Sequence, residues 1–255
     1  MIFVFDMDGT LLNSKKEISE NNKKAIQKLF SKGHKIVIAT ARLPRSIDKK
    51  IKSLDVTTDN IYYNGALVKC NDGTNFTNSI ENNLFVEIYK SIKENDSGAI
   101  ISIEENDKWF SCQEYDYKKE FSVSEGPEIL NETDFLNKRP NKILINRYKT
   151  SKYIKEQFSH SCNVIETDSS TLIQIMSKDA SKENSIKEIA EKYAFSRNKI
   201  YCFGDDHNDI GMFNYCANGV AMGNAIDELK KVAKYVTDTN DNDGIAKFIL
   251  NNRYF

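Results

Sequence analysis

The sequence has 255 residues, of which 40% are hydrophobic and 29% are charged, a length that suits one large domain or two unequal ones. The 36 basic and 37 acidic residues nearly cancel and form no long block of one sign, which argues against nucleic acid or an anionic membrane as a partner. No apolar run approaches the roughly 20 residues of a membrane span, and the first run, Ile2 to Phe5, ends at Asp6. We therefore expect a cytoplasmic protein.

Strand-like and helical patterns alternate at the start of the chain. Residues 2–5 and 35–39 are apolar runs typical of buried strands, and the apolar spacing between them predicts a helix over residues 19–32. Ser19 is a candidate N-cap of this helix, and we expect its buried face to include Phe30. This order predicts a β-α-β unit.

The same alternation returns near the C-terminus. A helix predicted over residues 182–193 leads into the apolar run 200–203, and a further strand at residues 220–222 precedes a helix around residues 225–233. Short apolar strands separated by helices are typical of a parallel sheet that is covered on both faces. The sequence therefore predicts an α/β fold with a Rossmann-like parallel sheet.

The pattern changes in the middle of the chain, between residues 80 and 179. A helix around Phe85 and Ile88 is followed by a series of strand candidates that no long helix separates. These candidates are residues 99–103, 108–112, 142–145 and 172–176. We predict an inserted α+β cap domain at residues 80–179 and a catalytic core formed by residues 1–79 and 180–255.

Two carboxylates directly follow the first predicted strand, in the sequence Asp6-Met7-Asp8-Gly9-Thr10. Open parallel sheets carry their sites at the carboxyl ends of their strands. A close pair of carboxylates can divide the work of catalysis, one as an ionised nucleophile and the other as a carrier of the proton. An acidic turn closed by Gly9 is the alternative interpretation of this motif taken alone.

Three further motifs lie at the ends of predicted strands or at the start of a predicted helix. Thr40 follows the second strand, and its hydroxyl group and the nearby backbone N–H groups suit a phosphate oxygen, although a simple N-cap is the alternative. Lys182 lies in the first turn of a predicted helix, where the helix dipole does not favour a positive charge. Asp205 and Asp209 follow the strand at residues 200–203.

These motifs bring several carboxylates to one edge of the predicted sheet. Asp6, Asp8, Asp205 and Asp209 would repel one another and any phosphate dianion unless a cation lay among them. Lys182 and Mg²⁺ can supply that positive charge, because magnesium prefers carboxylate, phosphate and water oxygens. The sequence thus predicts a magnesium site suited to phosphoryl transfer.

The four motifs, in this order and spacing, resemble those of the haloacid dehalogenase (HAD) superfamily of hydrolases, specifically its Cof-type branch with a class IIB cap between the second and third motifs. Asn64-Gly65-Ala66 and Asp243-Gly244 also resemble this branch. The resemblance implies a phosphatase that hydrolyses small phosphorylated metabolites, such as sugar phosphates or similar monoesters, through a phosphoaspartate. It covers the core by its motifs and the insert by size and position.

The resemblance also implies a role for each residue that matches a motif. Asp6 would be the nucleophile and Asp8 the general acid and base. Phosphate would be bound by Thr40, Lys182 and Asn208, substrate by Arg42 and Asn64, and Mg²⁺ by Asp6, Asp8 (through its main-chain carbonyl), Asp205 and Asp209.

Two other functions remain open at this point. A phosphomannomutase-like phosphosugar mutase would use the same aspartyl phosphate and return the phosphoryl group to a bound sugar. A non-catalytic metabolite-binding regulator would keep the fold without turnover, although it has no need of a nucleophile beside an acid. The motifs lie in the core and assign neither the natural substrate nor the oligomeric state; we expect selectivity to lie in the insert, where Trp109 is one candidate.

Overall fold

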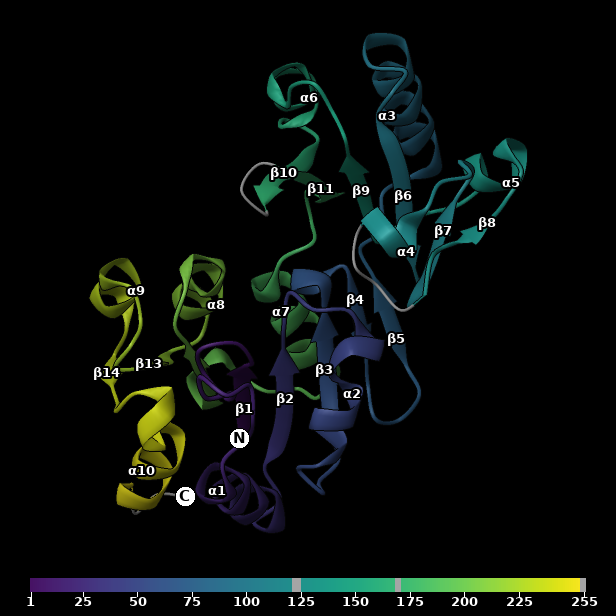
Figure 1. The fold of residues 1–255 in the computed structure, drawn as a ribbon. Helices are drawn as coiled ribbons and strands as arrows, with labels where there is room; N and C mark the ends of the chain where they lie inside the picture. The colour runs from purple at the N-terminus through teal and green to yellow at the C-terminus, as the bar shows by residue number, and fades with distance from the viewer. Residues whose placement is uncertain (121–124, 168–170, 253–255) are drawn as a thin grey trace. The chain divides into compact units, whose positions relative to one another are not determined.

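The computed structural model describes residues 1–120, 125–167 and 171–252, and the chain divides into two units. The first, here called the core unit, is formed by Met1–Phe76 and Ser181–Phe255. The second, here called the insert, is Thr77–Ala180. Figure 1 draws both units, and each is described by itself below.

An eight-stranded sheet lies at the centre of the core unit, in the order β14-β13-β12-β1-β2-β3-β4-β5. Its strands are β1 (Ile2–Asp6), β2 (Lys35–Ala39), β3 (Thr58–Tyr62), β4 (Leu67–Lys69), β5 (Asn75–Thr77), β12 (Ile200–Gly204), β13 (Asn218–Ala221) and β14 (Tyr235–Val236). β1 pairs in parallel with β2 and with β12, so that Ile2 lies beside both Lys35 and Ile200. Every residue of β1 is buried, as expected of a central strand.

The prediction of an α/β core is confirmed, but its sheet is mixed rather than wholly parallel. β4 runs antiparallel to β3, with Ile61 opposite Val68. The two strands are joined by a tight turn at Tyr63–Gly65, in which Tyr63 and Asn64 adopt positive φ angles. Strands joined by so short a turn must run in opposite directions, because a parallel connection needs a dozen residues or more.

Helices cover both faces of this sheet. They are α1 (Glu20–Ser31), α2 (Pro44–Lys52), α7 (Lys182–Lys192), α8 (Ile210–Tyr215), α9 (Asp227–Val232) and α10 (Gly244–Asn251). α1 packs against α10, whereas α7 packs against α8 and α8 against α9. The strand order reverses direction at β1, and right-handed crossovers to its two sides place these two groups on opposite faces. The carboxyl end of β1 is therefore the point where such folds carry their sites.

Side-chain caps begin two of these helices as the sequence predicts. Ser19 accepts a hydrogen bond from the backbone N–H of Asn22, and Ser181 accepts one from Asn184. The expectation that Phe30 is buried is wrong, because the residue is 40% exposed. The buried face of α1 is centred on Ala25, Ile26 and Leu29, and the step of 100° from Leu29 turns Phe30 outward.

The insert contains a second sheet of six strands, in the order β10-β11-β9-β6-β7-β8. The strands are β6 (Ile100–Glu105), β7 (Lys108–Ser111), β8 (Glu128–Ile129), β9 (Lys142–Asn146), β10 (Cys162–Thr167) and β11 (Leu172–Ser177), and the helices are α3 (Asn82–Asn95), α4 (Tyr117–Glu120), α5 (Glu132–Leu136) and α6 (Lys152–Phe158). Neighbouring strands are antiparallel except β7 and β8. This arrangement is the α+β domain that the sequence predicts.

One face of the insert sheet carries the hydrophobic core. Ile101 and Ile103 of β6 pack there against residues of α3, α5 and α6. Because side chains alternate along a strand, Ser102 and Glu104 lie on the opposite face, where Lys142 of β9 is the register partner of Glu104. That face mixes polar and apolar side chains, because Trp109 and Leu144 lie on it in register with Glu104 and Ser102, which are both buried.

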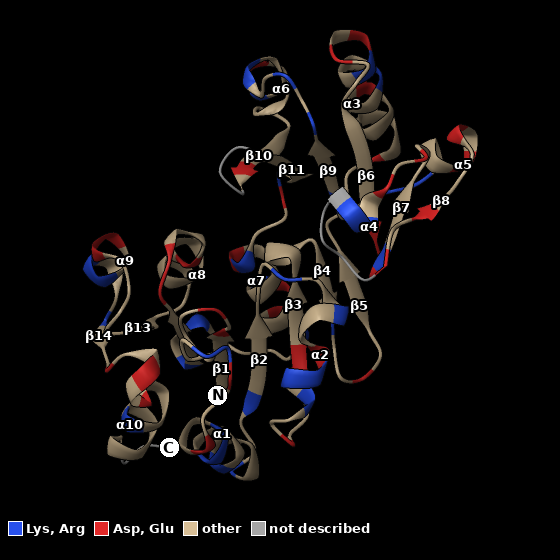
Figure 2. Ribbon diagram, viewed as in Figure 1, with Lys and Arg blue, Asp and Glu red and all other residues tan. Residues whose placement is uncertain are grey.

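Charged residues are interspersed rather than segregated within each unit (Figure 2). α1, α7 and α9 each carry acidic side chains in the first turn and lysine in the last. In residues 1–120, 125–167 and 171–252, no helix has the length and hydropathy needed to cross a bilayer.

Candidate active site

Three loops of the core unit converge on a buried ammonium group. Asp6 is the last residue of β1, Lys182 is the first residue of α7, and Asp209 ends the short 3-10 helix His207–Asp209 that follows β12. The Nζ atom of Lys182 donates to Oδ1 of Asp6 at 2.6 Å and to Oδ1 of Asp209 at 2.7 Å. The side chain of Lys182 is 1% exposed, that of Asp6 is 8% exposed and that of Asp209 is 0% exposed. Charged groups that are buried this deeply are stable only when opposite charges lie against one another.

Asp205 completes an acidic cluster with Asp6 and Asp209. One carboxylate oxygen from each lies within 4.8 Å of the others. The second oxygen of Asp209 accepts the backbone N–H groups of Asp205 at 2.9 Å and Asp206 at 3.2 Å, which fixes the turn after β12. Gly204 has to be glycine here, because a Cβ atom would lie 2.6 Å from that same oxygen.

Burial and charge act against each other in this cluster. Burial raises the pKa of Asp6 well above its usual value; Lys182 opposes this shift, while Asp209 and Asp205 add to it. Burial would lower the pKa of Lys182, but Asp6 and Asp209 together raise it above its ordinary value. The ammonium group stays protonated, and three carboxylates gather around its single charge.

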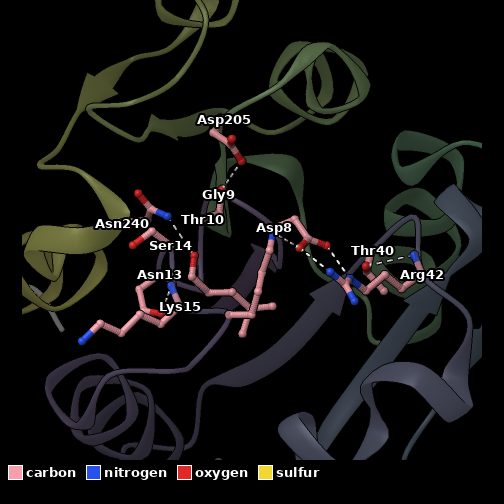
Figure 3. A network of polar contacts seen from close by, with 12 residues as sticks. Asp8, Gly9, Thr10, Asn13, Ser14, Lys15, Thr40, Arg42, Asp205 and Asn240 are labelled. Carbon is pink, nitrogen blue, oxygen red and sulfur yellow. Dashed lines mark hydrogen bonds and ion pairs between the residues drawn. The ribbon is translucent and has the colours of Figure 1, made fainter. Parts of the chain in front are cut away.

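Asp205 is held by the loop that follows the nucleophile. Thr10 Oγ1 donates to Oδ1 of Asp205 at 2.8 Å, as drawn in Figure 3. Gly9 has φ +78°, and a Cβ atom there would lie 2.1 Å from Oδ2 of Asp205. Burial raises the pKa of Asp205 to about 6; the bond from Thr10 counteracts the shift, and Asp209 contributes to it. Asp205 is therefore easier to protonate than an exposed aspartate, and a nearby positive charge would favour its ionised form.

Asp8 lies apart from this cluster and pairs with two cations. Arg42 forms a two-pronged ion pair with it, from Nε to Oδ2 at 2.6 Å and from Nη2 to Oδ1 at 2.7 Å (Figure 3). Lys16 Nζ also lies 3.0 Å from Oδ1. The bonds from Arg42 are the main cause of a lowered pKa at Asp8, and burial opposes them. In this arrangement Asp8 is ionised.

The remaining predicted site residues lie on neighbouring loops. Thr40 is buried at the end of β2, where its hydroxyl accepts the backbone N–H of Arg42 at 3.1 Å. Asn208 Nδ2 donates to Oδ1 of Asn64 at 3.1 Å. Gly65 places its backbone against α7, because a Cβ atom there would lie 2.2 Å from the carbonyl oxygen of Ser181. The loop after β3 thereby sets the start of the helix that carries Lys182.

The structure thus divides the predicted residues into three groups. One is the buried cluster Lys182, Asp6, Asp205 and Asp209; the second is Asp8 with Arg42, beside Thr40; the third is Asn64 with Asn208. Two contributors were not predicted: Thr10, which the sequence motif contains without a role, and Lys16. The signal for Thr10 is its place directly after Gly9 in the motif. Nothing in the local sequence indicates Lys16, which lies in the following turn with a φ angle of 59°.

Comparison with known protein families matches residues 3–249 to the haloacid dehalogenase-like hydrolases. The chain belongs to this family. Among curated relatives, two Bacillus subtilis proteins named 5-amino-6-(5-phospho-D-ribitylamino)uracil phosphatase, YitU and YcsE, are 25% and 28% identical to it. The alignment with YitU covers 97% of this chain and 96% of the relative, and that with YcsE covers 97% and 94%.

Solved structures of other proteins share the whole fold of this haloacid dehalogenase-like hydrolase. A Thermotoga maritima protein is 26% identical, with a TM-score of 0.85 over 98% of this chain and 97% of its own. A haloacid dehalogenase-like hydrolase from Bacteroides thetaiotaomicron is 26% identical, with a TM-score of 0.81 over 100% and 99%. The resemblance stated from the motifs is therefore confirmed at the level of family and fold.

Proposed function

We propose that this hydrolase is a Mg²⁺-dependent phosphatase that cleaves small phosphorylated metabolites through a phosphoaspartate on Asp6. The observation that carries the proposal is the buried contact of Lys182 with Asp6 and Asp209, beside Asp205. A nucleophilic carboxylate that must meet a phosphate anion requires positive charge around it. The phosphatase names of the Bacillus subtilis relatives support the same reaction class.

The reaction divides into two displacements at phosphorus. In the first, a carboxylate oxygen of Asp6 forms a bond to phosphorus while the bond to the leaving oxygen breaks, and Asp8 gives that oxygen a proton. In the second, Asp8 takes a proton from water as the water oxygen attacks phosphorus, which releases Asp6 and inorganic phosphate. Lys182 orients Asp6 throughout, because its Nζ atom lies 2.6 Å from Oδ1.

The residues present fit a magnesium ion. Asp6, Asp205 and Asp209 offer hard oxygen ligands within 4.8 Å of one another. Burial, and after it the neighbouring carboxylates, raises the pKa values of Asp6 and Asp205, and Lys182 only partly opposes these shifts. These three carboxylates, with the main-chain carbonyl of Asp8, are the proposed ligands. When bound, Mg²⁺ would lessen the repulsion between Asp6 and the phosphate and stabilise the charge of the transferring group.

The pairing of Asp8 with Arg42 suits one half of this cycle. An ionised Asp8 is ready to take a proton from water in the second displacement. To give a proton in the first, it needs its pKa raised, which follows when the anionic substrate draws Arg42 away. We therefore assign Arg42 and Asn64 to substrate binding, and Thr40, Lys182 and Asn208 to the phosphate.

Phosphate release from a panel of substrates tests the function. The panel should include 5-amino-6-(5-phospho-D-ribitylamino)uracil, sugar phosphates, nucleoside monophosphates and the phosphates of flavin and pyridoxal, each with Mg²⁺ and with EDTA. Asp6→Asn should abolish turnover, whereas Asp227→Asn, at an exposed position of α9, should leave it unchanged. If an isomeric sugar phosphate forms in place of inorganic phosphate, the hydrolase assignment gives way to a mutase.

A burst experiment tests the covalent step. With 4-nitrophenyl phosphate, whose leaving group needs no proton, Asp8→Asn should release one equivalent of nitrophenolate and then slow by about 100-fold or more, because water activation is lost. Mass spectrometry of the quenched protein should find the phosphoryl group on Asp6. A steady rate with no burst and no modified Asp6 would contradict the two-step route.

We propose further that the insert selects the substrate. Its Trp109 has an indole Nε1 that is buried and has no hydrogen-bond partner among the described residues, and an unsatisfied buried donor is uncommon in proteins. Trp109→Phe should change the order of kcat/KM across the panel while leaving the Mg²⁺ dependence as in the wild type. An unchanged order of substrates would remove Trp109 from the specificity residues.

A further inference from the structure

The loop that follows the nucleophile is held from outside by two asparagines. Residues 6–12 fold back on themselves, with the N–H of Leu11 donating to the carbonyl of Asp6 and that of Leu12 to Met7. This leaves the carbonyl groups of Gly9 and Leu12 facing outward. Asn224 Nδ2 donates to the first at 2.8 Å, and Asn240 Nδ2 donates to the second at 2.9 Å.

The two asparagines are also joined to each other. The backbone N–H of Asn240 donates to Oδ1 of Asn224 at 3.0 Å, so both ends of the Asn224 amide are engaged. The next residue, Asp241, accepts the backbone N–H of Ser14 at 2.8 Å. Figure 3 shows Asn240 beside this stretch of the catalytic loop. We call Asn224 and Asn240 the asparagine clasp.

The segment that carries Asn240 is itself tightly fixed. Asp243 has φ +57°, and at Gly244 a Cβ atom would lie 2.0 Å from the carbonyl oxygen of Asp238. The N–H of Gly223, next to Asn224, donates to that same carbonyl at 3.1 Å. The Asp243-Gly244 motif thus allows residues 238–244 to pack closely beside residues 223–224, which makes the clasp a rigid support.

The same region also holds the loop that bears Asp205. The N–H of Ile226 donates to the carbonyl of Asp205 at 2.9 Å, and the N–H of Met222 donates to the carbonyl of Gly204 at 3.0 Å. Asn224 therefore lies on a segment that is bonded both to the Gly9 loop and to the Asp205 loop. Those two loops meet directly where Thr10 donates to Asp205.

We propose that Asn224 and Asn240 are positioning residues, which set the loop of Asp8 and Thr10 against Asp205 without touching the substrate. Catalytic groups must be held within a fraction of an ångström to keep their rate advantage, and a hydrogen bond to the adjacent backbone carbonyl restricts the peptide that carries them. The catalytic part of this proposal rests on the proposed phosphatase function. Asn224 is exposed, so its bond adds little to stability and its effect lies in position.

Single and double substitutions with a matched control test the clasp. Asn224→Ala and Asn240→Ala each remove an amide donor to a loop carbonyl. Asn218→Ala removes the same kind of bond elsewhere in the core unit, where Asn218 Nδ2 donates to the carbonyls of Asn198 at 3.0 Å and Ile200 at 3.3 Å. Asn218 is buried at the start of β13, so its loss should lower Tm at least as much as either clasp substitution.

Three readouts separate positioning from stability. Each clasp variant should lose about tenfold in kcat, with KM within about twofold, whereas Asn218→Ala keeps both. The Mg²⁺ concentration that gives half of the metal-induced rise in Tm should increase severalfold in the clasp variants alone. The double variant should lose less than the product of the single losses, because Oδ1 of Asn224 accepts the backbone N–H of Asn240, so that Asn224→Ala already loosens the segment that carries Asn240.

The outcomes test the clasp and the proposed function separately. If the wild type releases phosphate but the clasp variants keep kcat and the Mg²⁺ midpoint within about twofold, or if Asn218→Ala loses as much, the clasp is refuted. If no substrate is turned over by the wild type, the phosphatase proposal fails, and the Mg²⁺ midpoint from Tm still supports or overturns the clasp.

Discussion

Replacing Lys182 by methionine tests the charge balance of the active site most directly. Methionine nearly matches the length of lysine but carries no charge, so Asp6 and Asp209 would face each other in a buried place. Removing one partner of a buried pair costs about 3–5 kcal/mol. At about 2–4 °C for each kcal/mol in a protein of this size, the Tm should fall by about 6–20 °C.

Urea unfolding in EDTA measures this loss, and Lys187→Met is the matched control. Lys187 lies on the same helix α7 and pairs with Glu183 at 2.6 Å, as close as Lys182 is to Asp6, but its side chain is 40% exposed. Exposed pairs at this helical spacing contribute about 0.2–0.5 kcal/mol. A loss for Lys182→Met within about 1 kcal/mol of the control would refute the account of a compensated buried charge.

A second substitution separates repulsion from lost packing. Asp209→Asn, added to Lys182→Met, removes one of the two carboxylates and keeps an oxygen that can accept the N–H groups of Asp205 and Asp206. Part of the lost stability should return. If the double variant is less stable than the single one, packing rather than charge explains the role of Lys182.

Three further predictions follow from neighbouring contacts. Gly9→Ala should lose more stability and Mg²⁺ affinity than Gly33→Ala. Both glycines have φ +78°, but a Cβ atom would lie 2.1 Å from Asp205 at Gly9 and would meet nothing within 4 Å at Gly33. Equal losses of the two variants in thermal unfolding with and without Mg²⁺ would contradict this prediction. In EDTA, Asp205→Asn should stabilise the protein above pH 6 by about 1 kcal/mol, because solvent around the half-buried carboxylate reduces the full effect of the pKa shift. The reason is that burial raises the pKa of Asp205 from 3.8 to about 6, so that its ionised form lowers the stability of the protein above that pH. Urea unfolding should show that the stability gained by the substitution shrinks as the pH falls toward 3.8. A gain that does not depend on pH would refute this explanation. Arg42→Met should move the alkaline limb of the pH profile of kcat/KM to higher pH, because Asp8 has to be protonated for the first displacement and the bonds from Arg42 are the main cause of its lowered pKa; an unmoved limb would show that Asp8 does not control it.

Elements with a clear period or a cap could be predicted closely from the sequence. The apolar run of β2 was predicted at residues 35–39, as observed, and α7 begins at Lys182 behind the cap Ser181, as predicted. α2 was missed, because only Ile47 and Ile51 mark its buried face among charged residues. The reversal at β4 depends on positive φ angles at Tyr63 and Asn64, which neither residue type announces.

For the site, the sequence could predict proximity but not pairing. Motifs at the ends of neighbouring parallel strands must meet, and Asp6, Asp205 and Asp209 do so. The two-pronged bond from Arg42 to Asp8 depends on how two loops 34 residues apart turn their side chains, which periodicity does not encode. The role of each site residue stays a prediction until turnover is measured.

The split of the core unit along the chain has a consequence for synthesis on the ribosome. β1 gains β2 as a neighbour within 40 residues, but its other neighbour, β12, begins at Ile200, after the whole insert has been made. The insert is one continuous stretch, Thr77–Ala180, with its own hydrophobic core. We therefore expect the insert to fold first, while one edge of β1 is still unpaired. An unfinished chain would be most prone to aggregate during that interval, and chaperones would bind it there.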